Sequence, residues 1–169
     1  MQRVDGNSGD TNRGLALLDS WFKDTHWDVI HFNWGLHDLC YRHPDSKTSG
    51  RRDKINGTIS VPLDEYRKNL ESLVDQLEGT GATLIWANTT FVPEGEAGRF
   101  AGDELKYNLA AEEIMNRHNV VIDDLHTMTS TFDPSLFVKP GNVHYTKEGY
   151  ATIAAQVAEQ IRIALIQEQ

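Results

Sequence analysis

Three short apolar runs alternate with stretches of helical periodicity, and this alternation constrains the fold more than any other feature of the chain. The runs cover residues 27–33, 83–88 and 120–124. They are rich in β-branched and aromatic residues, as is typical of strands. Because a helical stretch lies before, between and after them, we predict βαβ units with right-handed crossovers. The expected fold class is α/β with a parallel sheet.

Four stretches have apolar residues at helical spacing, and each is predicted to form a helix. They begin at Asp10 or Thr11, after Ser60, at residue 103 and at residue 147, and they end near residues 25, 79, 118 and 166. Their predicted apolar faces consist of Leu15, Leu18 and Phe22; Leu63, Tyr66, Leu70, Leu73, Val74 and Leu77; Leu105, Leu109, Ala110 and Ile114; and Tyr150, Ile153, Ala154, Val157 and Ile161. Residues 1–4 are compatible with the end of a further strand. The polar segment 41–60 is long enough for a functional loop or lid.

Composition narrows the class of protein. The 169 residues suit one domain, and 39% hydrophobic with 24% charged residues is a globular composition. The net charge of −9 argues against nucleic acid or an anionic membrane as the main partner. The single cysteine, Cys40, excludes an intramolecular disulfide and a cysteine-based zinc site. We expect no membrane span and recognise no signal peptide, and the sequence leaves the compartment open.

The unusual sequences gather where the predicted strands end. In open parallel sheets ligands bind beyond the carboxyl ends of the strands. The segments 34–38, 88–95 and 123–144 all fall on that edge, and the loop 6–11 joins them if residues 1–4 end a strand. His144 lies there, just before the last helix, and an imidazole can take up and return a proton near neutral pH. The pattern predicts a site at this edge; the alternative is an ordinary surface histidine.

Three short motifs resemble the conserved blocks of the SGNH (GDSL-type) hydrolases, a superfamily of esterases and lipases. They are residues 6–11 (GNSGDT), 35–38 (GLHD) and 143–146 (VHYT), so the resemblance extends from Gly6 to the last helix. It implies a three-layer α/β/α sandwich with a flavodoxin-like parallel sheet in the strand order 2-1-3-4-5. It also implies ester hydrolysis by serine acyl transfer, without a cofactor.

The resemblance assigns roles to three residues. Gly9 corresponds to the oxyanion-hole glycine, whose backbone N–H binds the developing alkoxide. His37 stands where the family usually has Asn, and an imidazole N–H can also donate a hydrogen bond. His144 corresponds to the general base. A plain turn at Gly9 and a structural role for His37 remain open alternatives.

The chain departs from the family pattern at two places. The family's Asp, three residues before the base, falls on Gly141, and only the uncharged Asn142 is near enough in sequence to hydrogen-bond the imidazole. No Gly-Asp-Ser occurs, and the family's first strand is missing before Gly6. We expect a chain truncated at its N-terminus, with an open edge at the strand 27–33. The alternatives are pairing with residues 1–4 or with another copy of the chain, which would mean self-association.

The nucleophile is therefore not assigned. Ser8, beside Gly9, is on the predicted edge but in a loop rather than a strand-to-helix turn. Cys40 follows the 35–38 motif closely and offers a thiol. Its more ordinary role is to pack as a small apolar side chain.

Three functions remain open. The first is hydrolysis of short acyl esters, with acetyl groups on carbohydrate as one class. The second is a non-catalytic module that binds carbohydrate or ester, with Trp34, Asp38 and Phe91 in contact with the substrate.

The third is a metal-dependent hydrolase. Its ligands would be His37, Asp38, His144 and a carboxylate of Asp123 or Asp124, which are residue types that suit zinc or manganese. The sequence contains no His-x-x-x-His or similar ligand spacing in its support.

Overall fold

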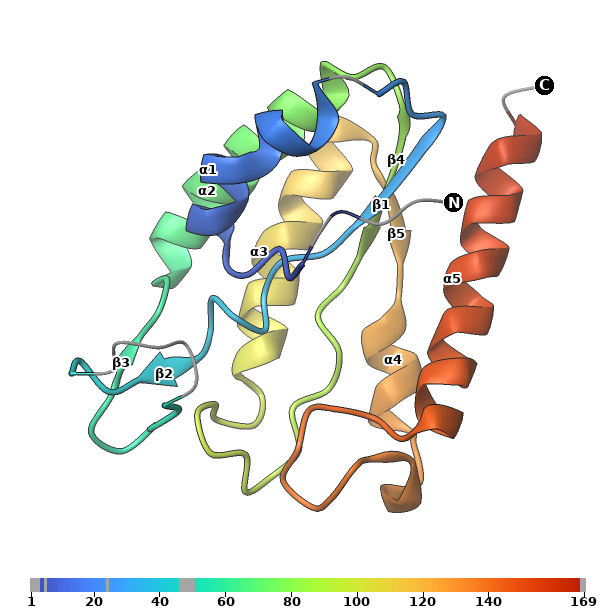
Figure 1. Ribbon diagram of the computed structural model, residues 1–169. Helices are drawn as coiled ribbons and strands as arrows, with labels where there is room; N and C mark the ends of the chain where they lie inside the picture. The colour runs from blue at the N-terminus through green and yellow to red at the C-terminus, as the bar shows by residue number, and fades with distance from the viewer. Residues whose placement is uncertain (1–3, 5, 24, 46–50, 168–169) are drawn as a thin grey trace.

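The chain folds as an α/β sandwich around a parallel sheet, as predicted. The computed structural model describes residues 4, 6–23, 25–45 and 51–167. Within them the main sheet consists of β1 (Val29–Phe32), β4 (Thr83–Ala87) and β5 (Val121–Asp123), in the order β1-β4-β5 and all parallel. Helices α1, α2 and α3 cover one face of the sheet and α5 covers the other (Figure 1).

The four predicted helices lie close to their predicted positions. Their bounds are Thr11–Phe22 for α1, Leu63–Glu78 for α2, Asp103–His118 for α3 and Lys147–Gln167 for α5. The structure adds the short helix α4 (Leu125–Ser130) and a 3₁₀ helix at Pro134–Leu136. Asp10 caps α1, because its side chain accepts a hydrogen bond from the Arg13 N–H. No helix among the described residues is long and apolar enough to cross a membrane.

The polar segment 41–60, in which we predicted a functional loop or lid, contains two short strands. Strands β2 (Tyr41–Arg42) and β3 (Thr58–Ile59) pair as a small antiparallel sheet. The Tyr41 N–H donates to the Gly98 carbonyl at 2.7 Å, which attaches this sheet to the loop after β4. Residues 46–50 lie outside the described part. The two ends of the segment are thus held in place, which a sequence of scattered charges does not reveal.

The main core lies between the sheet and helices α1, α2 and α3. From α2 it takes Tyr66, Leu70, Leu73, Val74 and Leu77, all at most 1% exposed. Two buried tyrosines complete it, and both hydroxyls donate to carbonyls: Tyr66 to Trp34 at 3.0 Å and Tyr107 to Val61 at 2.6 Å. Hydrogen-bonded hydroxyls are what allow tyrosine to be buried without a desolvation penalty.

The predicted apolar face of α3 is partly wrong. Leu105 and Leu109 are 54% and 58% exposed, whereas Tyr107 and Met115 are buried. The buried Asn108 on the same face forms two hydrogen bonds to the backbone of Thr89, so a polar side chain occupies a core position. The buried face of α3 is therefore determined by these contacts and not by the spacing of its leucines.

The side of the sheet that faces α5 is only thinly covered. Tyr150 is 48% exposed, although we predicted it to face the core. Among the described residues no strand pairs with the outer edge of β1. Val4 is not in a strand, and the possible strand at residues 1–3 lies outside the described part.

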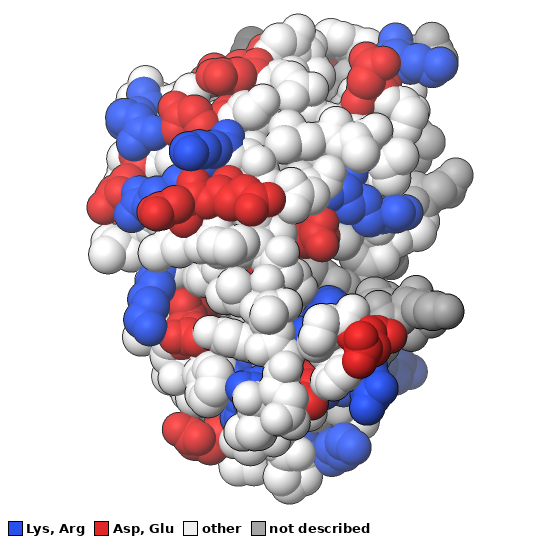
Figure 2. All heavy atoms as spheres, turned by 90° about the vertical axis from the view of Figure 1, so that its left-hand side faces the viewer, with Lys and Arg blue, Asp and Glu red and all other residues white. Residues whose placement is uncertain are grey.

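On the opposite side of the molecule, acidic and basic side chains are interspersed rather than gathered by sign (Figure 2).

Candidate functional site

His144 is held by its neighbours and directed outward. Val143 and Tyr145 on either side are 6% and 5% exposed, so their side chains anchor the loop in the core. The His144 carbonyl accepts a hydrogen bond from the Val138 N–H at 3.0 Å. Its side chain, between two buried ones, is exposed at the edge where the loops after β4 and β5 meet.

Asn142 fixes the tautomer of His144. The Asn142 Oδ1 accepts a hydrogen bond from the His144 backbone N–H at 2.9 Å and lies 2.8 Å from the ring Nδ1. A backbone N–H can only donate, so the shared atom must be the amide oxygen. The proton of a neutral ring is therefore on Nδ1, and Nε2 is left as the basic nitrogen. The hydrogen bond that we predicted between these residues is present.

Gly141 is the residue at which the resemblance to SGNH hydrolases would place an Asp. Its φ of +67° favours glycine, and a Cβ there would lie 2.7 Å from the Gly95 carbonyl oxygen. The backbones of the loops after β4 and β5 thus pack directly on each other. This close approach leaves no room for a side chain at residue 141.

The Gly9 N–H, the predicted oxyanion donor, already has an acceptor. It donates to the Asn7 Oδ1 at 2.7 Å. The Nδ2 of the same carboxamide lies 3.4 Å from the His37 Nε2. One amide group thus reaches both predicted oxyanion donors, and an ester group is of similar size. An oxyanion would have to displace Asn7 to reach Gly9.

His37 is half-buried beside two arginines. Burial, followed by the positive charges of Arg99 and Arg42, lowers the pKa of His37 below its ordinary value of 6.5. The imidazole of His144 contributes in the same direction, which indicates that the two histidines are near each other. Since its pKa is lowered, the His37 ring is neutral at pH 7 and has one N–H to donate.

Asp38 is inside the protein, not on a substrate surface. The carboxyl group is fully buried, and its Oδ1 accepts hydrogen bonds from the Thr11 N–H at 2.8 Å and the Thr11 hydroxyl at 2.6 Å. We predicted contact with substrate, but Asp38 instead ties the start of α1 to the loop after β1. Burial raises the pKa of Asp38 to about 6, against the opposing effect of the Thr11 hydrogen bonds.

The raised pKa of Asp38 predicts a loss of stability on going from pH 4 to pH 6.5. Between 3.8 and about 6 the unfolded chain is ionised at this residue while the folded chain still holds the proton. Stability therefore falls as pH rises through this window, by about 3 kcal/mol at ~1.4 kcal/mol per pH unit. The free energy of unfolding in urea, measured against pH for the wild-type chain and for Asp38→Asn, tests this prediction. The Asn side chain does not titrate, so the difference between the two profiles gives the contribution of Asp38. Parallel pH profiles for the two proteins would contradict it.

Trp34 and Phe91, the two aromatic residues predicted to contact substrate, differ in location. Trp34 is 4% exposed and packs against Phe32 and Gly14, so it belongs to the core and cannot stack on a sugar. The prediction was wrong because Gly14 of α1 has no side chain and leaves space for the Trp34 indole in the core. Phe91 is half-buried, with its ring against those of His126 and Phe137. It remains at the edge, where contact with a ligand is still a prediction.

The two nucleophile candidates also differ. Ser8 is half-buried in the same loop as Gly9. Cys40 is fully buried, and its thiol lies 3.6 Å from the Tyr41 carbonyl oxygen. Its environment is that of a small core side chain.

The predicted set of metal ligands does not form a group. Asp123 bonds instead to His31 at 2.9 Å and to Gln156 at 2.7 Å, beneath α5. Among the described residues the one cluster of three metal-ligating side chains is Asp75, Glu78 and His118, on α2 and α3. These helix ends are remote from the loops that follow the strands, so the metal-hydrolase alternative is not supported.

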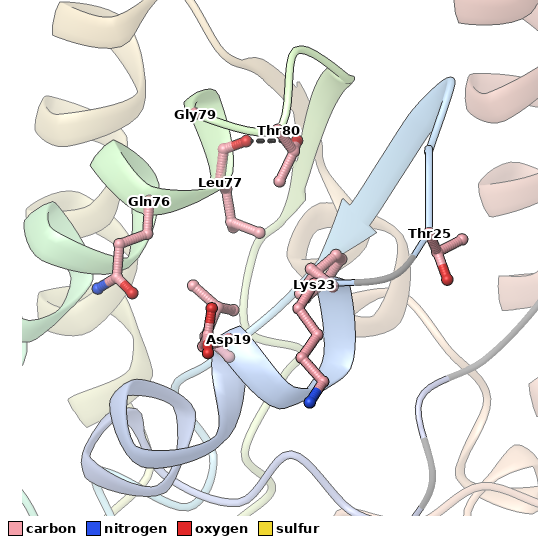
Figure 3. A pocket seen from close by; sticks show the side chains of 9 residues that line it. Asp19, Lys23, Thr25, Gln76, Leu77, Gly79 and Thr80 are labelled. Atoms are coloured by element: carbon pink, nitrogen blue, oxygen red, sulfur yellow. Dashed lines mark hydrogen bonds between the residues drawn. The ribbon is translucent and has the colours of Figure 1, made fainter.

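A hollow of about 340 Å³ lies between the carboxyl-terminal ends of α1 and α2. Lys23 and Gln76 are among the residues that line it (Figure 3). Because these helices lead into β1 and β4, the hollow is at the amino ends of the strands. It is thus on the opposite edge of the sheet from His144 and does not belong to the candidate site.

The sequence analysis did not predict the side-chain contacts that Asn7, Thr11 and Arg42 make around the candidate site. Asn7 and Thr11 lie within the 6–11 motif, and an Asn two residues before a loop glycine is a signal for the turn that Asn7 makes. Nothing in the polar segment around Arg42 indicates that its guanidinium approaches His37.

Comparison with known proteins shows the fold. A lipase/acylhydrolase from Enterococcus faecalis has 18% identity and a TM-score of 0.68, over 91% of this chain and 71% of its own. An acetyl xylan esterase has 14% identity and a TM-score of 0.70, over 92% and 78%. A catalytic mutant of an acetylxylan esterase from Geobacillus stearothermophilus has 18% identity and a TM-score of 0.70, over 92% and 68%. No protein-family model matches the chain, and no curated protein matches it significantly in sequence. The chain therefore has the same fold as these esterases and this acylhydrolase, which is the fold that the resemblance to SGNH hydrolases predicted.

Proposed function

We propose that this chain carries an ester-hydrolase site that works by acyl transfer on short acyl esters, with acetyl groups on carbohydrate as the favoured class. The observation that carries the proposal is the Asn142–His144 pair, because it leaves Nε2 as a base at the exposed edge of the sheet. The printed names of the similar structures, an acylhydrolase and acetyl xylan esterases, support the same reaction class.

In this proposal His144 Nε2 takes the proton of a hydroxyl nucleophile as that oxygen bonds to the acyl carbon. The carbonyl oxygen becomes an alkoxide that displaces the Asn7 side chain and receives hydrogen bonds from the Gly9 N–H and from His37. The ester bond then breaks, and the alcohol leaves with the proton from His144. Water releases the acyl group by the same route. Ser8 is the nucleophile candidate within the described residues, and no cofactor takes part.

We expect His144→Ala to lose ester hydrolysis. Loss of a general base lowers rates by roughly 100-fold or more, and the same variant should no longer form a single adduct with a fluorophosphonate. Initial rates with p-nitrophenyl acetate and intact mass spectrometry measure the two effects. His26→Ala is the matched control, because His26 is an exposed histidine before β1. Peptide mapping of the adduct identifies the nucleophile. The proposal would be contradicted if the wild-type chain and His144→Ala hydrolysed the ester at equal rates and the folded wild-type chain formed no adduct.

Ligand binding without turnover is the second candidate. Two observations favour it: the Gly9 N–H is already bonded to Asn7, and the packing at Gly141 leaves no space for an acidic partner. Calorimetry with an acetylated xylo-oligosaccharide tests it. Binding in the absence of hydrolysis, weakened by Phe91→Ala, would favour this candidate over the first.

A further inference from the structure

The guanidinium of Arg42 has unusual surroundings. Its Nε donates to the Ser60 hydroxyl at 3.1 Å, and its Nη2 lies 3.4 Å from the His37 Nδ1. Its Nη1 is buried without a hydrogen-bond partner. Within the described part of the chain the ion pairs of Arg52 and Arg99 both go to Glu96, and none involves Arg42. The charge of Arg42 is thus not neutralised by a carboxylate, and His37 is one of its few polar neighbours.

This geometry decides between the two neutral forms of His37. A guanidinium is always protonated and can only donate. A proton on Nδ1 would point at a cation, so Nδ1 must be the acceptor. On the other side the Asn7 Nδ2 is also a donor, at 3.4 Å from Nε2. The charged donor dominates, because charge-assisted hydrogen bonds are about twice as strong as neutral ones. The Nε2–H is then the proton of the ring.

We propose that Arg42 is a positioning residue that fixes His37 as the neutral Nε2–H tautomer, so that the ring presents a donor toward the Gly9 loop. In this form His37 replaces the side-chain amide that the family uses at this position. The catalytic meaning of the assignment rests on the proposed function, but the tautomer itself does not.

The other charged groups near His37 support a neutral ring. Burial lowers the pKa of His37, the charges of Arg99 and Arg42 lower it further, Asp10 acts in the opposite direction, and His144 adds a smaller lowering. The positive charges also favour negative charge at the Nε2 side, where an oxyanion would form.

Nitrogen NMR of the full chain, labelled with ¹⁵N-histidine, tests the proposal without any need for turnover. A His37→Gln spectrum assigns the His37 signals. In the wild-type chain at pH 7 we expect Nδ1 to resonate as an unprotonated nitrogen and Nε2 as an N–H. In Arg42→Gln we expect mixed tautomers and a titration midpoint that moves to higher pH. Arg42→Lys keeps the charge, so its midpoint should stay close to that of the wild type.

Ser60→Ala is the control, because it removes the other hydrogen bond of Arg42 and should leave the His37 signals unchanged. An Nδ1–H or mixed ring in the wild-type chain would overturn the proposal, even if no variant folds. So would a folded Arg42→Gln chain with wild-type His37 signals. If the tautomer is as expected but ester hydrolysis is absent, only the proposed function fails.

Discussion

Gly35→Ala is expected to destabilise the folded chain by about 3 kcal/mol. A Cβ at residue 35 would lie 1.9 Å from the Thr89 Oγ1, and the φ of +156° is itself unfavourable for a side chain. The Thr89 backbone is held by two hydrogen bonds to Asn108, of 2.7 and 2.8 Å, so only a rotation of the Thr89 side chain could reduce the clash. The free energy of unfolding in urea measures the effect. The same clash would disturb the loop that carries His37.

A double variant isolates the cause. The Thr89 Oγ1 is buried without a hydrogen-bond partner, so Thr89→Ala alone should cost little. In Gly35→Ala/Thr89→Ala the clash with Oγ1 disappears, and the nearest remaining contact is 3.1 Å, to the Thr89 Cβ. We therefore expect most of the lost stability to return. A double variant as unstable as Gly35→Ala would attribute the loss to the backbone conformation instead.

The sequence predicted the architecture because local patterns determine it. The bounds predicted for the third helix, residues 103–118, coincide with those of α3, and each predicted strand contains an observed one. The alternation of strands and helices then leaves little choice of topology. The edge at which the site should lie follows from this topology alone.

Side-chain directions were less predictable, because they depend on partners remote in sequence. Trp34 follows a strand, as an edge aromatic would, yet the absence of a side chain at Gly14 opens a space into which it packs. Leu105 has the spacing of a core residue, but Tyr107 takes the core position through its hydrogen bond to Val61. No pattern within one element contains this information.

In the candidate site, too, local contacts were predictable and contacts between residues remote in sequence were not. The Asn142–His144 hydrogen bond spans two residues and was predictable. The approach of Arg42 to His37 depends on β2 turning back beside the loop after β1, within a polar segment that has no clear periodicity. The tautomer of His37 could therefore be inferred only from the structure, whereas that of His144 follows from the local geometry of residues 142–144.

Two substitutions that place a carboxylate near His144 should have opposite results. Gly141→Asp introduces the acidic residue that the resemblance to SGNH hydrolases would place at this position. We expect it to lower stability by about 2 kcal/mol or more, because its Cβ would meet the Gly95 carbonyl oxygen at 2.7 Å and φ is +67°. It should bring no gain in ester hydrolysis. A Gly141→Asp chain as stable as the wild type would show that the loops at residues 95 and 141 can separate.

Asn142→Asp should instead raise His144-dependent hydrolysis by about tenfold. An Asp oxygen can accept both hydrogen bonds that the Asn142 Oδ1 accepts now, so the ring keeps its orientation. In a serine-protease triad, Asp→Asn costs roughly 10⁴ in rate, because the amide imposes the wrong tautomer. Here the backbone N–H already holds the amide oxygen toward Nδ1, so the tautomer is correct and only the charge is missing. The gain should therefore be smaller than that loss. Rates with p-nitrophenyl acetate, with Asn142→Asp/His144→Ala as the control, measure it; an unchanged rate would mean that the charge of the partner does not limit this base.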